Sequence, residues 1–440
     1  MSPSASPGVP LMPSTSADLR LTADIVTAVD AGFEQQVAWL ADLVRMPSLR
    51  GDEAPAQDFM ARAFHARALA VDRWKVAVED ISHLPGFSPV SVSYDNAYNV
   101  VGAWRAQGAG RSLILNGHID VVPTGPLSMW QVPPFEPQIR DGWMNGRGAG
   151  DMKAGLAANL FALDALHRAG LEPDGDVYLQ SVVEEECTGN GALACLARGY
   201  RAECALISEP SGAHLMSAQV GVMWFQVKIR GRPAHVAVAG TGANAIEAVF
   251  PIVQALHALE HRWNDQGHPA FAGHDHPLNF VLSRIEGGDW TSSVPSWCTF
   301  DMRVAVFPGV DLAQARAEIE QTVALAAQKD AFLRYNPPEV VYHGFQAEGY
   351  ELPKNTAAQA VLEQCHGDVT GRPLGHLAST GTTDARFFGL YAGIPALVYG
   401  PVAEQIHGFD ERVSLASVRE VTQTIALFIA RWCGVRPRRT

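Results

Sequence analysis

The chain has 440 residues, of which 47% are hydrophobic, and its formal net charge is −13. This length and hydrophobic content are sufficient for two globular domains with ample cores. The negative charge argues against a nucleic-acid surface, because phosphate binding needs clustered Lys and Arg side chains.

Cysteine usage and hydropathy indicate the compartment. The six cysteines are scattered without close pairs, which predicts reduced thiols and a cytoplasmic protein. No apolar run approaches membrane-spanning length, so no membrane association is expected. Residues 1–17 are rich in Ser and Pro and are expected to form a disordered leader.

The first half of the chain alternates helices with apolar strands. Apolar residues recur at helical spacing over 22–45, and a second helix is expected over 153–169. Short apolar runs predict strands over 98–104, 112–115, 177–183 and 205–208. Strands that are apolar on both faces and separated by helices indicate a largely parallel, covered sheet in an α/β fold.

The pattern changes near residue 217. Period-two alternation predicts strands over 224–230, 279–285, 297–306 and 340–344. Helices are expected between them, over 243–263 and 312–328. The order β-α-β-β-α-β with half-buried strands is typical of an open-faced α+β sandwich.

The covered α/β pattern returns after about residue 349. Helices are expected over 356–364, 384–389 and 415–432, with an apolar run over 395–399. We therefore predict one domain made of residues 18–215 and 348–440. Residues 216–347 would form a second domain inserted into it.

Polar side chains follow the ends of the predicted strands. His118 and Asp120 follow the strand over 112–115, and Glu209 follows the strand over 205–208. Three glutamates at 184–186 and His407 also lie just beyond apolar runs. Singly, each fits a hydrogen-bonded loop residue or a solvated helix start. The carboxyl ends of parallel strands line one crevice, so together they predict a metal site.

The motifs occur in the order found in a known enzyme family. They are Gly117-His-Ile-Asp-Val-Val-Pro123, Gly146-Arg-Gly-Ala-Gly-Asp-Met-Lys153, Glu184-Glu-Glu-Cys-Thr-Gly-Asn-Gly191, Ser208-Glu-Pro210, Gly231-Arg-Pro-Ala-His235, Gly381-Thr-Thr-Asp384 and His407. As a set they resemble the co-catalytic dizinc hydrolases. That family includes acetylornithine deacetylase, succinyl-diaminopimelate desuccinylase, aminoacylase and glutamate-releasing carboxypeptidases. The resemblance covers nearly the whole chain after the leader. It implies that residues 18–215 and 348–440 form a zinc-peptidase-like dizinc catalytic domain and that residues 216–347 serve as a lid and in dimerisation.

The resemblance implies a role for each metal ligand. Asp151 would bridge two zinc ions and would precede a cis peptide bond. His118 and Glu209 would complete one ion, and Glu186 and His407 would complete the other. Cobalt or manganese could replace zinc, because these ions compete closely for such ligands.

Glu185 resembles the general base, which takes a proton from water and delivers it to the leaving amine. The three adjacent glutamates leave the register ambiguous, and the glycines at 189 and 191 favour Glu185 as base and Glu186 as ligand. The Asp120 side chain is expected to hydrogen-bond the far ring nitrogen of His118. Cys187 is expected to be a packed thiol, because the ligand set is complete without it.

The inserted segment would supply two further residues. His235 resembles a histidine that stabilises the oxyanion, and its alternative is a hydrogen-bonded loop histidine. In dimeric relatives the smaller domain pairs with its twin, so a homodimer is expected, with His235 acting in cis or in trans. Arg303 resembles the arginine that grips the substrate carboxylate, and its alternative is a surface arginine. Ser293 stands where many relatives carry Asn, which leaves the bound carboxylate open.

Gly381, Thr382 and Thr383 could offer backbone N–H groups to an anionic end of the substrate. The alternative is a helix cap by Thr383 or Asp384.

The expected function is a metal-dependent hydrolase that removes the acyl group from an N-acyl amino acid or similar small amide. A dipeptidase or carboxypeptidase of the same family is the alternative among enzymes, with a short peptide as substrate. A non-catalytic ligand-binding homologue is the alternative of another class. It predicts a broken site, whereas every ligand and the base are present.

Overall fold

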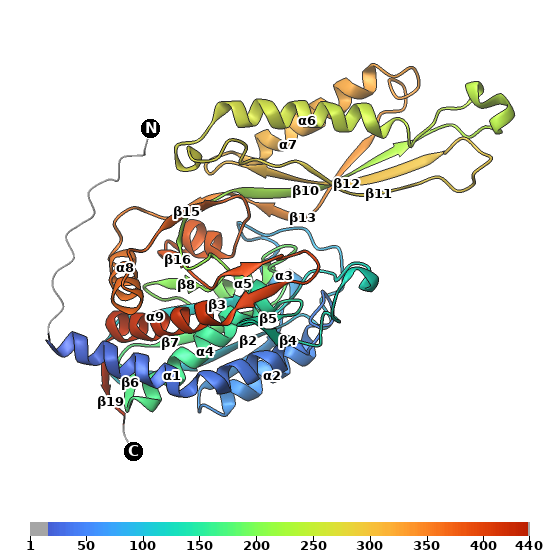
Figure 1. The fold of residues 1–440 in the computed structure, drawn as a ribbon. Coiled ribbons are helices and arrows are strands. Elements are labelled where there is room, and N and C mark those ends of the chain that lie inside the picture. Colours follow the sequence, from blue (N-terminus) through green and yellow to red (C-terminus); the bar gives the residue numbers. More distant parts are fainter. Residues whose placement is uncertain (1–15, 439–440) are drawn as a thin grey trace.

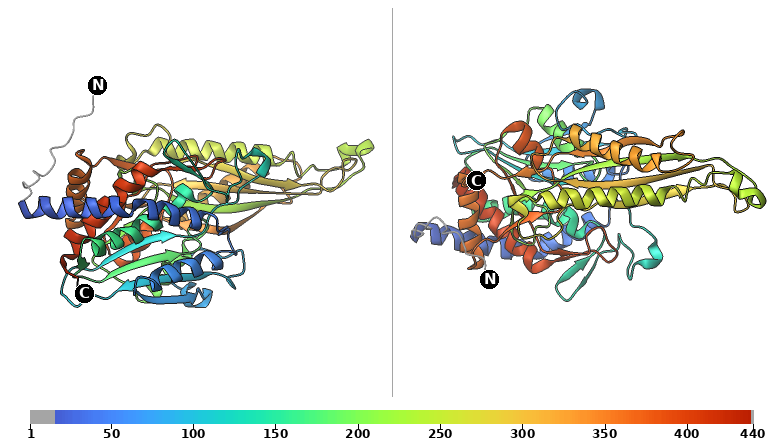
Figure 2. Two further views of the ribbon diagram at one scale, coloured as in Figure 1. Left: turned by 60° about the horizontal axis from the view of Figure 1, so that its bottom comes forward. Right: turned by 90° about the horizontal axis from the view of Figure 1, so that it is seen from above.

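The computed structural model describes residues 16–438 (Figure 1). They form two bodies, each with its own sheet and hydrophobic core. The smaller body lies across the larger one and extends beyond it (Figure 2). Of the predicted leader, residues 1–15 lie outside the described residues, and Ser16 starts the first helix.

Nine strands form the sheet of the larger body. Their order is β1-β2-β7-β3-β8-β16-β9-β14, with β15 also paired to β9. The central strands β7, β3, β8 and β16 are parallel, and the edges are mainly antiparallel. The predicted, mainly parallel α/β sheet is confirmed for this centre. The strands are β1 (Ala70–Lys75), β2 (Tyr98–Trp104), β3 (Leu113–His118), β7 (Val177–Val182), β8 (Ala205–Ile207), β9 (Leu215–Gln219), β14 (Tyr350–Glu351), β15 (His376–Ser379) and β16 (Ala396–Val398).

Helices cover both faces of this sheet (Figure 1). On one side lie α1 (Ser16–Val44), α2 (Ala54–His65), α4 (Ala154–Arg168) and α9 (Leu415–Cys433), and on the other α3 (Val78–Ile81) and α5 (Asn190–Ala197). A further helix, α8 (Ala357–Thr370), packs on α9. In α1, Ile25, Val29 and Leu40 are buried, as the helical spacing predicted.

Two small antiparallel sheets border the larger body. One consists of β4 (Gln138–Arg140), β5 (Trp143–Asn145), β17 (Ala403–Glu404) and β18 (Arg412–Ser414). The other pairs β6 (Leu171–Pro173) with β19 (Val435–Pro437). These strands have two or three residues each, too few to show a period in the sequence.

The smaller body is an open-faced sandwich, as predicted. Its strands β10 (Gly221–Arg230), β11 (Val281–Gly287), β12 (Trp297–Val306) and β13 (Glu339–Ala347) pair antiparallel in the order β11-β12-β10-β13. The helices α6 (Val249–Gln266) and α7 (Leu312–Gln328) cover one face (Figure 1). Phe225 and Val227 are buried beneath them, whereas Trp224 and Gln226 are half-buried on the opposite face.

The first predicted domain boundary, between residues 215 and 216, falls at the start of β9. That strand pairs with β14, β15 and β16 of the larger sheet. Only Val220 separates β9 from β10, so the chain passes from one sheet to the other without an intervening loop that would mark the boundary. We propose that the domains divide near Val220 and near residue 348.

The described residues give two further observations about the whole chain. Between residues 16 and 438, no helix combines the length and the apolarity needed to cross a bilayer. All six cysteines are free thiols, and five of them are buried.

Candidate active site

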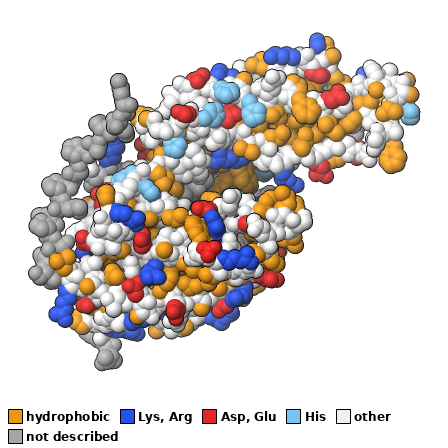
Figure 3. Space-filling model, viewed as in Figure 1, with side chains coloured by type: hydrophobic (Ala, Val, Ile, Leu, Met, Phe, Trp, Pro, Cys, Tyr) orange, Lys and Arg blue, Asp and Glu red, His pale blue; other side chains and the backbone are white. Residues whose placement is uncertain are grey.

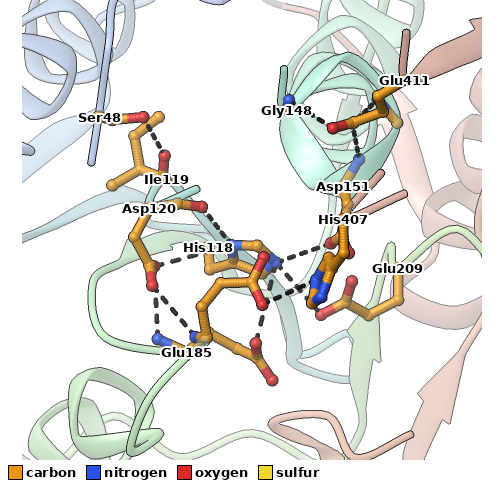
Figure 4. Close-up of polar contacts among 12 residues, drawn as sticks. Ser48, His118, Ile119, Asp120, Gly148, Asp151, Glu185, Glu209, His407 and Glu411 are labelled. Carbon is orange, nitrogen blue, oxygen red and sulfur yellow. Dashed lines mark hydrogen bonds and ion pairs between the residues drawn. The ribbon is translucent and has the colours of Figure 1, made fainter. Parts of the chain in front are cut away.

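Three adjacent parallel strands deliver most of the candidate ligands (Figure 4). His118 is the last residue of β3, which lies between β7 and β8. Glu185 and Glu186 follow β7, and Glu209 follows β8. Because parallel strands end at the same edge of a sheet, these side chains converge there.

Asp151 lies between two histidines. Its Oδ1 is 3.1 Å from His118 Nε2, and its Oδ2 is 3.3 Å from His407 Nε2. His407 Nε2 is also 3.0 Å from Glu186 Oε2, and His118 Nε2 is 3.7 Å from Glu209 Oε1. The Asp151 carboxylate therefore presents one oxygen to each half of the site, which suits a bridge between two cations.

A buried glutamate holds the glycine-rich turn that carries Asp151. The Glu411 carboxylate accepts the N–H groups of Gly148, Gly150 and Asp151 at 3.0, 2.8 and 3.0 Å. It also accepts Arg147 Nη1 at 2.7 Å. Gly148 has φ +77°, a conformation that favours glycine. The Asp151–Met152 peptide bond is cis.

The three adjacent glutamates point in different directions. Glu184 forms a two-pronged ion pair with Arg50, whose Nη2 is 2.8 Å from Glu184 Oε2, and accepts the Tyr94 hydroxyl at 2.7 Å. Glu185 and Glu186 instead line the pocket described below. The Glu184 carboxylate is therefore fully occupied away from the pocket.

Asp120 meets His118 through a different atom from the one expected. His118 Nδ1 is 2.9 Å from the Asp120 carbonyl oxygen, whereas the carboxylate oxygen is 3.7 Å away, too far for a hydrogen bond. The carboxylate accepts the N–H groups of Glu185 and Glu186 at 3.3 and 3.1 Å. Asp120 thus orients the imidazole with its backbone and the two glutamates with its side chain.

Several carboxylates lie close together at this edge of the sheet, and their pKa values are shifted. Burial, reinforced by the charge of Glu209, raises the pKa of Glu185 well above its usual range. Burial likewise raises the pKa of Glu209 to about 8. The charge of Glu186 raises the pKa of His407 to about 11. Burial opposes ionisation of Asp151, yet hydrogen bonds from both histidines hold its pKa below its usual range.

The donor set fits bound metal ions. His118, Glu185 and Glu209 have ligand atoms within 4.8 Å of one another, and so do His118, Asp151 and Glu186. Within residues 16–438, the buried Glu186 Oε1 finds no hydrogen-bond partner, a costly arrangement that a cation would relieve. Imidazole and carboxylate are suitable ligands for zinc. Cys187 belongs to neither group and is a partly buried thiol.

The candidate ligands Asp151, Glu186, Glu209 and His407 line a pocket of about 600 Å³ between the two bodies, whose hollow is visible in Figure 3. Arg303 reaches it from the smaller sheet. The guanidinium donates to the carbonyl oxygens of Asn279 and Thr380 at 3.3 and 3.0 Å. No carboxylate among the described residues forms an ion pair with it, and burial lowers its pKa to about 10. Arg303 is thus a charged group with donors free for an anion.

The turn 381–383 lines the same pocket. The N–H of Gly381 donates to Ser379 Oγ at 3.0 Å. The Thr383 hydroxyl accepts the N–H of Ala385 at 3.2 Å and donates to Gln219 at 2.7 Å. The Thr383 hydroxyl therefore acts as a helix cap, as the alternative proposed. Thr382 lines the pocket.

His235 does not line this pocket. Its side chain is exposed, and its Nδ1 accepts the N–H of Ala237 at 3.1 Å. β10 runs from Trp224 at the pocket to Arg230, roughly 20 Å along a strand, before His235 is reached. Ser293 pairs with His235 in an isolated β-bridge and, like His235, does not line the pocket.

Several residues of the site carry no signal in the sequence. Glu411 is a single glutamate four residues after His407, and Arg50 lies 134 positions from its partner Glu184. Trp224 could have been suspected, because it faces away from the helices on an alternating strand.

Comparison with known proteins shows the family of this chain. Residues 114–431 match the model of peptidase family M20/M25/M40. An N-formyl-4-amino-5-aminomethyl-2-methylpyrimidine deformylase from Halalkalibacterium halodurans is 30% identical and covers 95% of this chain and 99% of its own. The chain belongs to peptidase family M20/M25/M40.

The comparisons also give a second relative in sequence and a solved structure with the same fold. A succinyl-diaminopimelate desuccinylase from Marinobacter nauticus is 29% identical over 84% of this chain and 92% of its own. Human carnosine dipeptidase 1 shares the fold, with a TM-score of 0.75 at 14% identity over 94% of this chain and 99% of its own. Membership confirms the predicted metal-dependent hydrolase of amide bonds.

Proposed function

We propose that this M20 enzyme is an N-acyl-amino-acid deacylase that uses two zinc ions. The observation that carries the proposal is Asp151, whose two oxygens face two histidines at one end of a pocket that contains Arg303. Asp151 would bridge the ions, with His118 and Glu209 on one and Glu186 and His407 on the other. When bound, such a pair supplies Lewis acidity to the amide carbonyl and to water.

Glu185 would act as the general base. Its carboxylate lines the pocket, with Oε2 4.0 Å from His118 Nε2. Its backbone N–H is held by the Asp120 carboxylate at 3.3 Å, which limits its movement. A buried carboxylate with a raised pKa can keep the proton of the attacking water and pass it to the leaving amine.

The pocket favours an N-acyl amino acid over a dipeptide. Arg303 can hold the carboxylate of either substrate through two N–H donors. A dipeptide also carries a free ammonium group, which needs an acid that the metal ions do not use. The only acids among the described lining residues are Asp151, Glu186 and Glu209, which are proposed metal ligands, and Glu185, which is the proposed base, so none is left to pair with an ammonium group.

We propose that the chain forms a homodimer through the smaller body and that His235 stabilises the oxyanion in the partner's site. β11 is an edge strand on which Ile285 is 49% exposed, and Phe250 of α6 is 63% exposed. Unpaired edge strands and exposed apolar side chains are typical of surfaces that pair. The free thiols support a cytoplasmic location.

A screen of zinc-loaded enzyme tests this function. The substrates are N-acetyl, N-formyl, N-succinyl, N-carbamoyl and aminoacyl derivatives of several amino acids. We expect chelator-sensitive hydrolysis of N-acetyl or N-formyl amino acids. Hydrolysis of dipeptides alone would instead assign a dipeptidase, and hydrolysis only of neutral N-formyl amines would assign a deformylase like the relative from Halalkalibacterium halodurans.

A further inference from the structure

Three side chains form a row across the open face of the smaller sheet where it meets the pocket. Trp224 on β10 and Val281 on β11 are the cross-strand partners of Arg303 on β12, and all three line the pocket. Directly opposite side chains on adjacent strands lie about 5 Å apart. Arg303 therefore stands between an indole and an aliphatic side chain.

The surface around this row is apolar. The Phe345 ring packs against Trp224 in a T-shaped contact, with centroids 5.2 Å apart and planes at 88°. Met216 and Val222 are buried and also line the pocket. Phe345 lines the pocket beside Trp224 and is only 6% exposed, so its contact restricts the movement of the indole ring.

Among the described residues that line the pocket, Arg303 is the one cationic side chain outside the proposed metal site. A second carboxylate on the substrate would be buried without a counter-ion, and a side-chain ammonium would meet the same obstacle. Burying an unpaired charge is costly.

We propose that the substrates are N-acyl amino acids with an apolar, preferably aromatic, side chain, selected by Trp224, Arg303 and Val281. The inference rests on the proposed deacylase activity and names its substrate class. An amino acid carries its carboxylate and its side chain on one carbon. A carboxylate held by Arg303 therefore brings the side chain onto Trp224 or Val281.

Binding to metal-loaded Glu185→Gln enzyme tests this selection without turnover. Calorimetry compares N-acetyl-L-phenylalanine with N-acetylglycine, N-acetyl-L-lysine, N-succinyl-L-phenylalanine and the carboxylate-free N-acetylphenethylamine. We expect N-acetyl-L-phenylalanine to bind roughly 10- to 100-fold more tightly than each of the others. Trp224→Ala in the same background should remove the preference over N-acetylglycine, and Trp224→Phe should keep most of it.

Trp297→Ala is the matched control. Trp297 is half-buried on the same face of β12, six residues before Arg303, and does not line the pocket. This variant should keep the preference. Val281 is 47% exposed, so the polar side chain of Val281→Ser is tolerated there. This variant should weaken the preference for N-acetyl-L-phenylalanine over N-acetylglycine several-fold.

Three results would overturn the proposal. They are equal or tighter binding of the lysine or succinyl derivative, equal binding of N-acetylphenethylamine, and a preference that survives in Trp224→Ala. Failure of the deacylase function is distinguishable, because it would show as no turnover by the wild-type enzyme while the binding preference for N-acetyl-L-phenylalanine persists.

Discussion

The carboxylate of Glu411 accepts the backbone N–H of Asp151 at 3.0 Å. Glu411 lies four residues after His407, so one side chain ties the loop of one proposed ligand to the turn of another. The same carboxylate neutralises the buried guanidinium of Arg147, whose Nη2 donates to the Gly408 carbonyl oxygen at 3.0 Å. The spacing between Asp151 and His407 thus depends on a residue that faces away from the pocket.

Glu411→Ala should weaken zinc binding by about 10- to 100-fold, as loss of an outer hydrogen-bond partner typically does. The variant should also lose roughly 3 to 5 kcal/mol of unfolding free energy, because Arg147 would remain buried without its partner. Chelator competition and urea unfolding measure the two effects. Glu404→Ala, which breaks an exposed ion pair with Arg412 in the neighbouring sheet, is the control and should change neither. Unaltered zinc affinity in Glu411→Ala would exclude this positioning role.

Arg303→Met should lower kcat/KM for an N-acyl amino acid by about 10- to 100-fold, because a charged hydrogen bond contributes roughly 1.5 to 3 kcal/mol. A matched amide without the carboxylate should be affected far less. The kcat/KM of Arg303→Lys should lie between those of the wild-type enzyme and Arg303→Met, since an ammonium cannot form the two-pronged contact. Equal losses on both amides would show that Arg303 supports the fold of the pocket rather than the carboxylate.

His235→Ala and Glu185→Ala should each be inactive alone and should regain activity when mixed. In a mixed dimer one site would combine an intact Glu185 with His235 from the other chain. Steady-state rates after co-refolding, with sedimentation to measure the dimer, check this. An inactive mixture of proven heterodimers would place His235 in its own chain's site or outside catalysis.

Removal of the metal should make stability fall as pH rises. Burial raises the pKa of Glu209 to about 8, and the charge of Glu186 raises that of His407 to about 11. From about pH 5 to 8 the folded state then binds more protons than the unfolded state, so its free energy of unfolding decreases with pH. Zinc needs deprotonated ligands, so its stabilising effect should grow over the same window. Melting temperatures with zinc and with chelator at three pH values test the sign. A zinc effect that shrinks with rising pH would contradict it.

The sequence predicted the elements that have a clear period. β12 and α7 span the residues expected from alternation and helical spacing, and β2 spans the residues expected from an apolar run. α2 and β1 were not predicted, and the end strands of the larger sheet pair antiparallel rather than parallel. The direction in which an edge strand pairs depends on the connection that leads into it, and local sequence patterns do not predict that connection.

The convergence of the candidate ligands was predictable where a candidate ligand lies at the end of a strand. His118 and Glu209 follow apolar runs, and the order of β7, β3 and β8 places them side by side. The hydrogen bonds that hold them were not predictable. Glu411 accepts from a turn about 260 positions earlier, and Asp120 uses its carbonyl rather than its carboxylate on His118. Such contacts depend on the fold of distant segments.

The central claim is that Glu185 moves the proton while other residues hold the metal. The most direct measurement is the turnover and zinc content of Glu185→Ala on the best N-acyl amino acid from the screen. Turnover should fall by at least about 100-fold, the usual contribution of a general base, while two zinc ions per chain remain. Near-normal turnover with full zinc content would contradict the account.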